Sequence, residues 1–214
     1  PLPNSAGKNY FINGALDFRQ RGTSFSSGAN SYTADRWDAW GGFATAGAYT
    51  VSQTSGIVLT GFQNSIRVQR TNGSLVTTAP VIGQSMETSV FLPLAGQTVT
   101  FSFWARAGAN FSASGGTMNA SLTTGTGTDQ RIATAYTGAV TASSPNFTLT
   151  TSWQRFTATV TLASSATEMA LQFSYNPTGT AGINDWMEIT GVQVEIGSVV
   201  TNFTRAGGHI ADEL

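Results

Sequence analysis

The sequence predicts an all-β fold built from two antiparallel sheets, and three observations support this prediction. Short segments in which apolar and polar residues alternate recur along the chain, which is the pattern of half-buried strands. Turns rich in Gly and Ser separate these segments, and the 214 residues include 24 glycines. The period of an amphipathic helix is almost absent. Because a single all-β domain of this length buries a substantial core, we expect one folded domain.

The first 40 residues contain little strand pattern. Residues 1–8 are rich in Pro, Ser and Gly and are expected to form a flexible leader. We expect residues 9–18 to form a short strand, a turn and a return, since they contain the favoured hairpin turn Asn-Gly. Residues 20–40 show no clear periodicity before Trp37, so we expect a long loop there, held down by its aromatic residues.

From residue 44 onward, strand patterns follow one another at the spacing of a β-sandwich. In chain order we expect strands at residues 49–53, 57–62, 65–70, 81–91, 98–106, 118–123, 131–136, 153–162 and 169–175. Within residues 98–106 the Val and Phe side chains share one face, while Trp104 and Arg106 share the other. About nine or ten antiparallel strands, most with one apolar face, predict a two-sheet jelly-roll sandwich.

Residues 181–203 are expected to form the last long strand, which closes a sheet. Apolar and polar residues alternate along both of its halves, and Gly191 separates the halves. A glycine inside a strand pattern usually marks a bulge, so we expect the strand to kink at Gly191 and continue. Gly197 is expected to end it.

Composition limits the partners and the domain plan. Only 10% of residues are charged and the formal net charge is −1, so neither nucleic acid nor an anionic membrane surface is an expected partner. No segment has the length of a transmembrane helix, so membrane insertion is not expected, and the first residues lack the pattern of a signal peptide. The chain has no cysteine, which excludes disulfides and cysteine zinc sites. We assign residues 9–204 to the jelly-roll domain and residues 205–214 to a C-terminal tail.

Five segments, taken together and in order, point to a known family. They read NYFINGALDFRQRG, YTADRWDAW, TVTFSFWARA, TSWQRFTATVTL and ITGVQVEIGSVVTNFTRAGG. As a set they resemble the carbohydrate-binding-module-like jelly-roll domain of bacteriophage tail-fibre and other virion proteins, from about Asn9 to Leu214. The resemblance implies an extracellular location on the virion surface, a homotrimer in contact with other virion proteins, and recognition of a bacterial surface glycan.

Tryptophans on solvent-facing strand positions are the first candidates for glycan binding. Sugars stack their C–H faces on aromatic rings, while polar side chains bind their hydroxyl groups. Alternation places Trp104 on one face with Arg106, and Trp186 on one face with Glu188. The alternative is that Trp104 and Trp186 fill a second layer or a subunit interface, where tryptophan is also common.

Four further aromatic residues complete the set. Trp40 and Tyr136 are additional ligand-binding candidates, both placed by loops. Trp37 and Trp153 are assigned to the core. Arg36, next to Trp37, is expected to pair with an acid rather than with a ligand.

The sequence favours binding over catalysis. The only histidine, His209, lies in the expected tail, which is a poor place for the base of a Ser-His-Asp triad. The carboxylates are scattered, and no spacing singles out a glycosidase pair. Jelly-roll carbohydrate-binding modules often hold a structural calcium between the N-terminal segment and the last strand, so the resemblance implies a possible calcium site at Asp17 and Asp185.

These inferences predict a non-enzymatic domain of a phage fibre or spike that recognises a host surface glycan. A structural module for capsid decoration or fibre assembly, which binds sister subunits and no sugar, is the alternative. A glycan-cleaving enzyme is the third possibility.

Overall fold

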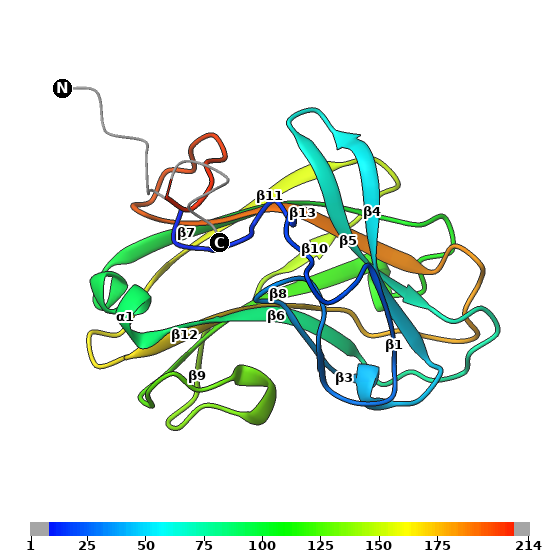
Figure 1. The fold of residues 1–214 in the computed structure, drawn as a ribbon, viewed down its shortest axis with the longest axis horizontal. Helices are drawn as coiled ribbons and strands as arrows, with labels where there is room; N and C mark the ends of the chain where they lie inside the picture. The colour runs from blue at the N-terminus through cyan, green and yellow to red at the C-terminus, as the bar shows by residue number, and fades with distance from the viewer. Residues whose placement is uncertain (1–8, 208–214) are drawn as a thin grey trace.

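Two antiparallel sheets face each other in the computed structural model of the chain, which describes residues 9–207 (Figure 1). Sheet A contains, from edge to edge, β1 (Ser24–Ser26), β4 (Tyr49–Leu59), β5 (Phe62–Arg70), β13 (Trp186–Ile196), β7 (Thr98–Ala107) and β11 (Gln154–Thr161). Sheet B contains β10 (Asn146–Thr148), β8 (Thr117–Gly125), β12 (Glu168–Ser174), β6 (Pro80–Met86), β3 (Asp38–Gly41) and β2 (Ser31–Tyr32), and β9 (Val140–Ser143) also pairs with β8. The two-sheet antiparallel jelly-roll sandwich predicted from the sequence is confirmed.

In the part of the chain that the structure describes, helical structure is confined to segments of three or four residues, of which Thr88–Phe91 and Leu92–Leu94 are adjacent. The α-helix α1 is Thr88–Phe91, and 3-10 turns lie at Gly42–Ala44, Leu92–Leu94, Ser114–Gly116 and Ile132–Thr134. Within residues 9–207, no helix has the length and hydrophobicity needed to cross a membrane.

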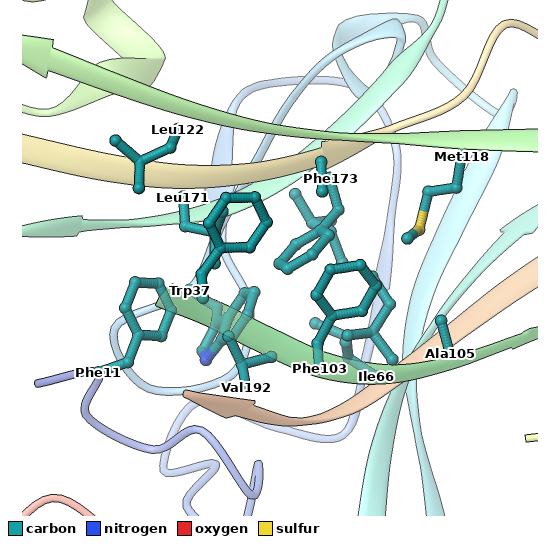
Figure 2. Packing of buried hydrophobic residues seen from close by; sticks show 14 of the residues in the cluster. Phe11, Trp37, Ile66, Phe103, Ala105, Met118, Leu122, Leu171, Phe173 and Val192 are labelled. Atoms are coloured by element: carbon teal, nitrogen blue, oxygen red, sulfur yellow. The ribbon is translucent and has the colours of Figure 1, made fainter. Parts of the chain in front are cut away.

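Aromatic rings fill the space between the sheets. Trp37, which is fully buried as predicted, stacks on Phe173 at 6.2 Å between ring centroids and meets the edge of Phe11 at 5.7 Å. Phe103 of β7 packs edge-on against Phe173 of β12 at 4.8 Å, which joins the two sheets directly. Figure 2 shows these rings side by side at the centre of the core. Each such aromatic pair contributes about 1 kcal/mol beyond the apolar area that it buries.

Strand β13 lies in the middle of sheet A, between β5 and β7, and it is kinked as predicted. Its register with β7 shifts between Thr190 and Gln193, and Gly191 has φ +62°. A Cβ atom at Gly191 would lie 2.6 Å from the Phe62 ring and 3.0 Å from Trp104. Glycine is therefore required at this bulge for its backbone conformation and for the close approach of both rings.

The predicted hairpin at residues 9–18 is wrong. The segment forms turns, and its Asn9 side chain accepts a hydrogen bond from the Val194 amide and donates one to the Val192 carbonyl. Strand β5 stops pairing with β13 at Ile189, so the edge of β13 beyond the bulge is open. The N-terminal segment takes that edge, with Tyr10 donating to the Val194 carbonyl.

Several predicted boundaries also differ from the structure. The expected loop at residues 20–40 contains the short strands β1 and β2 and the start of β3. Residues 57–62 are the tip of the β4–β5 hairpin rather than a separate strand, and β6 ends at Met86 before α1. The last strand is shorter than residues 181–203, because loops flank β13 on both sides. The expected tail begins at residue 205, and its described part, residues 205–207, is loop.

The predicted strand at residues 131–136 is a 3-10 turn instead. Strand β8 has its outer edge occupied by β9 and β10, so no edge is open beside it. The segment lies across the outer face of sheet B, where the Ile132 amide donates to the Ser85 hydroxyl.

Candidate functional site

The outer face of sheet B carries a cluster of polar and aromatic side chains. Since side chains alternate across a strand, Asp38 and Trp40 of β3 point outward while Ala39 points into the core. Asp38 is paired with Tyr32 of β2 on one side and with Gly83 of β6 on the other. The absence of a side chain at Gly83 leaves room for the close approach of the Trp40 ring and of the β12 backbone.

A loop closes one side of this face and forms a pocket. Residues 126–139, which connect β8 to β9, return over the sheet and enclose a cavity of about 120 Å³. Its lining includes Tyr32, Asp38, Ser85, Glu87, Gln130 and Arg131.

Glu168 of β12 holds the loop of residues 126–139 against sheet B. This fully buried carboxylate accepts hydrogen bonds from the backbone amides of Gly127, at 3.2 Å, and Gln130, at 2.9 Å. A Cβ atom at Gly125 or Gly127 would lie within 3.0 Å of the Glu168 side chain. The glycine-rich segment GTGTD is a turn, as its sequence indicates, and its glycines make room for this carboxylate.

An ion pair forms the wall of the pocket. Arg131 donates two hydrogen bonds to the Asp38 carboxylate, at 2.5 and 3.3 Å. The Tyr32 ring lies 4.1 Å from the Arg131 guanidinium and 4.6 Å from that of Arg21. Burial raises the pKa of Asp38 from its ordinary value of 3.8, and the Arg131 guanidinium acts against this rise. Arg36, at the same pocket, pairs with Glu87 as predicted.

Two of the predicted ligand-binding residues lie on the same side of sheet B as this pocket, but neither lines it. Trp40 lies over Gly83, since a Cβ atom there would come within 2.9 Å of its ring. Tyr136 is buried in the loop beside Gly125, and burial raises the pKa of its hydroxyl. Sequence reasoning missed Tyr32, Asp38 and Arg131. The alternation of Asp38 with Trp40 along DAW was the available signal, but the strand itself was not predicted.

The other four predicted residues meet on the outer face of sheet A, on the opposite side of the sandwich. Glu188 of β13 is paired with Arg106 of β7 and with Arg67 of β5. The fully buried Glu188 carboxylate accepts hydrogen bonds of 2.7 Å from the Nε atoms of both arginines. Trp186 lies on the same face and contacts both guanidiniums, at 4.3 Å from Arg67 and 5.5 Å from Arg106.

The tryptophans of this face are only partly exposed. Trp186 also packs over Gly108, so its ring is covered by protein groups at the positions where a sugar would stack. Trp104 packs against Gly191 at the bulge. Trp153, predicted to lie in the core, is instead half-buried on the outer face, 4.9 Å from the Arg106 guanidinium.

The structure does not bring Asp17 and Asp185 together. Asp17 binds Asn64 near the start of β5, and Asp185 binds Arg70 at its end. Six residues of strand separate these partners, which is about 20 Å. Among residues 9–207 no group of three or more metal-binding side chains of His, Asp or Glu occurs. Calcium therefore stays a prediction without an assembled site, and His209 lies outside the described residues.

The fold is a two-sheet jelly-roll β-sandwich, which this chain shares with carbohydrate-binding modules of known structure. One similar structure is the C-terminal family 22 carbohydrate-binding module of Clostridium thermocellum Xyn10B, with TM-score 0.53 and 16% identity over 92% of this chain and 99% of that one. TmCBM61 in complex with β-1,4-galactotriose has TM-score 0.50 and 14% identity over 88% and 99%.

A phage protein also has this fold. The enzymatically active domain of tailspike protein 4 from bacteriophage CBA120 matches with TM-score 0.52 and 14% identity over 89% of this chain. The match spans 22% of the tailspike chain. Neither a protein-family model nor a curated protein matches the sequence.

Proposed function

We propose that this chain is a carbohydrate-binding domain that holds a glycan against the outer face of sheet B. The observation that supports this function best is the pocket beside Tyr32, in which Asp38 and Arg131 are joined as an ion pair. Arg131 is 37% exposed and can donate hydrogen bonds to sugar hydroxyls, while Asp38, which is 3% exposed, orients the guanidinium and neutralises its charge. Trp40 adds an apolar surface next to these polar groups, as sugar recognition requires.

The domain belongs, in this proposal, to a fibre or spike on the surface of a phage, where it recognises a bacterial surface glycan as a homotrimer. The fold shared with a tailspike domain supports the virion role. The fold shared with a module solved in complex with β-1,4-galactotriose supports the ligand class.

The domain is proposed to bind without cleaving. Of the buried carboxylates, Asp38, Asp185 and Glu188 are each paired with arginine, and Glu168 and Glu195 accept hydrogen bonds from backbone amides. A glycosidase needs one carboxyl group that is protonated and one that attacks or activates water, and paired carboxylates are held away from both roles.

The test is titration of the purified chain with capsular and O-antigen polysaccharides. We expect one of them to bind, and we expect Arg131→Ala to weaken that binding about tenfold or more, because it removes a charged hydrogen-bond donor. Thr157→Ala, an exposed change on the opposite sheet, is the matched control and should leave the affinity unchanged. Unchanged affinity in a folded Arg131→Ala protein would remove the pocket from the proposal, and release of reducing ends would show an enzyme.

A further inference from the structure

The outer face of sheet A carries an arrangement that the sheet B pocket does not explain. Two arginines on different strands share one buried carboxylate, with two tryptophan rings beside them. We call Arg67, Arg106, Glu188, Trp153 and Trp186 the arginine platform. It lies on the other side of the sandwich from the pocket, so it does not take part in the proposed glycan site.

Glu188 orients both guanidiniums. Arg67 binds its Oε1 atom through Nε and Nη2, at 2.7 and 2.6 Å, and Arg106 binds its Oε2 atom through Nε, at 2.7 Å. The Thr54 hydroxyl donates a further 2.7 Å bond to Oε1. The carboxylate is 0% exposed, so no oxygen of Glu188 remains for a ligand.

The outer edges of the arginines remain available. The side chains of Arg67 and Arg106 are 29% and 27% exposed. Within residues 9–207, the Nη1 and Nη2 groups of Arg106 donate to no protein acceptor and are not buried, and the same holds for Nη1 of Arg67. These N–H groups therefore face solvent while the Nε groups hold Glu188.

The tryptophans restrict the arginines. The Arg106 guanidinium lies 4.9 Å from the Trp153 ring and 5.5 Å from the Trp186 ring, and Arg67 lies 4.3 Å from Trp186. Arginine loses side-chain freedom when it binds a ligand, and stacking removes much of that freedom beforehand. The rings also exclude water from one side, which strengthens hydrogen bonds to a charged acceptor.

The platform has an excess of positive charge. Two arginines surround one carboxylate, and the neighbouring outward residues of β4 and β5, including Ser52 and Gln69, are uncharged. Arg155 of β11 lies one row further on, opposite Trp104. Guanidinium groups bind carboxylate, phosphate and sulfate oxygens with matched geometry.

We propose that the arginine platform binds an oxyanion carried by an acidic polysaccharide, through the outward N–H groups of Arg106 and Arg67. Neutral sugars are not its ligands, because the ring of Trp186 is covered by the guanidiniums. The carboxylate of a uronic acid and the phosphate or sulfate ester of a sugar share the required chemistry. This inference does not rest on the proposed function of the sheet B pocket.

The experiment titrates the full chain at low salt with polygalacturonate, dextran sulfate and a yeast phosphomannan, which differ in the oxyanion. Fully methyl-esterified polygalacturonate is the neutral control for the first probe. We expect at least one polyanion to bind and the methyl ester not to bind. Binding of none of the three, or equal binding of the methyl ester, would overturn the proposal.

Two variants distinguish binding by the oriented arginines from binding by net positive charge alone. Arg106→Gln removes one cation, and we expect it to weaken binding about tenfold or more. The double change Arg106→Gln with Glu188→Gln restores the net charge of the platform and avoids an underpaired carboxylate, yet it should bind as weakly as the single variant. Wild-type affinity in either folded variant would contradict the proposal.

Two further experiments test whether the ligand is a polysaccharide and whether it binds at the arginine platform. Poly-L-glutamate presents carboxylates without sugar, and binding as tight as to the polysaccharide would replace the glycan with an acidic peptide and overturn the assignment. Trp40→Ala, on sheet B, should leave polyanion binding unchanged. If Trp40→Ala abolishes it, the polyanion occupies the pocket and the platform is not its site.

Discussion

Buried charges in this domain are each held by several hydrogen-bond partners at once. Arg70 is the fullest case, since it is 0% exposed and binds Asp185, Ser112 and four backbone carbonyl groups. A planar guanidinium with five N–H groups fits this set, and the three donors of a lysine ammonium do not. At the residue scale, stability therefore depends on arginine geometry as well as on charge.

We expect Arg70→Lys to lower the free energy of unfolding by roughly 3–5 kcal/mol, because it leaves buried acceptors and a buried carboxylate underpaired. Arg36→Lys is the matched control, since Arg36 is 41% exposed in its ion pair with Glu87 and such pairs contribute about 0–1 kcal/mol. Urea unfolding of the two variants measures the difference. Similar losses in both would show that the contacts of Arg70 do not matter more than those of a surface pair.

The proposed glycan binding should depend on pH through Asp38. Burial raises its pKa in the folded protein above the unfolded value, so its contribution to stability is fully present below the unfolded pKa and is lost as the pH rises through the folded pKa. The expected effect of pH on glycan affinity has the opposite sign. Below the folded pKa, Asp38 becomes neutral and its ion pair with Arg131 weakens.

We therefore expect affinity for a neutral glycan to fall on acidification, with a midpoint above the ordinary value of 3.8 for an aspartate. Asp38→Asn cannot titrate and should bind with an affinity that is flat over the same range. Titrations of both proteins across the acidic pH range test this expectation. A parallel fall in the variant would assign the pH dependence to another group.

At the scale of the element, the bulge in β13 combines two requirements at Gly191. A side chain there would adopt a left-handed conformation and would also overlap the rings of Phe62 and Trp104. Gly47 separates the two effects, because it has a similar φ of +70° with no atom within 4 Å of an added Cβ. A substitution at either glycine would destabilise the domain through the backbone conformation, but only a substitution at Gly191 would also cause a clash.

We expect Gly191→Ala to destabilise the domain by about 1–3 kcal/mol more than Gly47→Ala, the usual range for overpacking. Thermal unfolding of the two variants gives the comparison. If the two substitutions have equal effects, the rings of Phe62 and Trp104 move aside without cost and the close approach is not a constraint.

Strands with one apolar face could be predicted from the sequence, and segments held by distant partners could not. β7 and β13 alternate cleanly because they lie in the middle of sheet A with one face toward the core. Residues 131–136 show similar alternation, but Ser85 binds the Ile132 amide and Glu168 binds the amide of the preceding residue, Gln130, and both partners are remote in sequence. Local pattern does not contain that information.

The same reason explains which site residues were predicted. The pairing of Glu188 with Arg106 follows from two well-patterned strands, whose outward faces were predicted. The pairing of Asp38 with Arg131 joins residues 93 positions apart, one on a strand mistaken for a loop and the other on a loop mistaken for a strand. Neither Asp38 nor Arg131 was predicted as a ligand-binding residue, because register between distant segments is not visible in one sequence.

At the scale of the whole molecule, exposed apolar side chains are candidate contacts for the proposed homotrimer. Ile57 is 86% exposed at the tip of the β4–β5 hairpin, which rises away from the other strands of sheet A in Figure 1. Beside it lies a cavity of about 510 Å³, lined in part by Phe62 and Gly61. Isolated apolar residues are ordinary on a surface, but an apolar tip next to a cavity fits contact between subunits.

The proposed homotrimer predicts that Ile57→Asp shifts the mass in solution toward the monomer, since a charge at a buried contact is strongly unfavourable. Ser55→Asp, on the same hairpin, adds the same charge at an exposed polar position and is the control. Light scattering after size exclusion measures both. A trimer that persists in Ile57→Asp would place the subunit contact elsewhere, and a monomeric wild type would remove the homotrimer.

The first and last described parts of the domain are tied to each other. The Asn9 side chain donates to the carbonyl of Thr204 at 3.0 Å, and Arg205 binds Asp17 at 2.7 Å. A chain that enters at residue 9 and leaves at residue 204 thus does so at one point. A force that pulls the two ends of the domain apart would therefore act first on these bonds. After these bonds break, the force acts on β13 at the centre of sheet A. The bonds made by Asn9 and Arg205 would therefore set the force at which the domain begins to unfold.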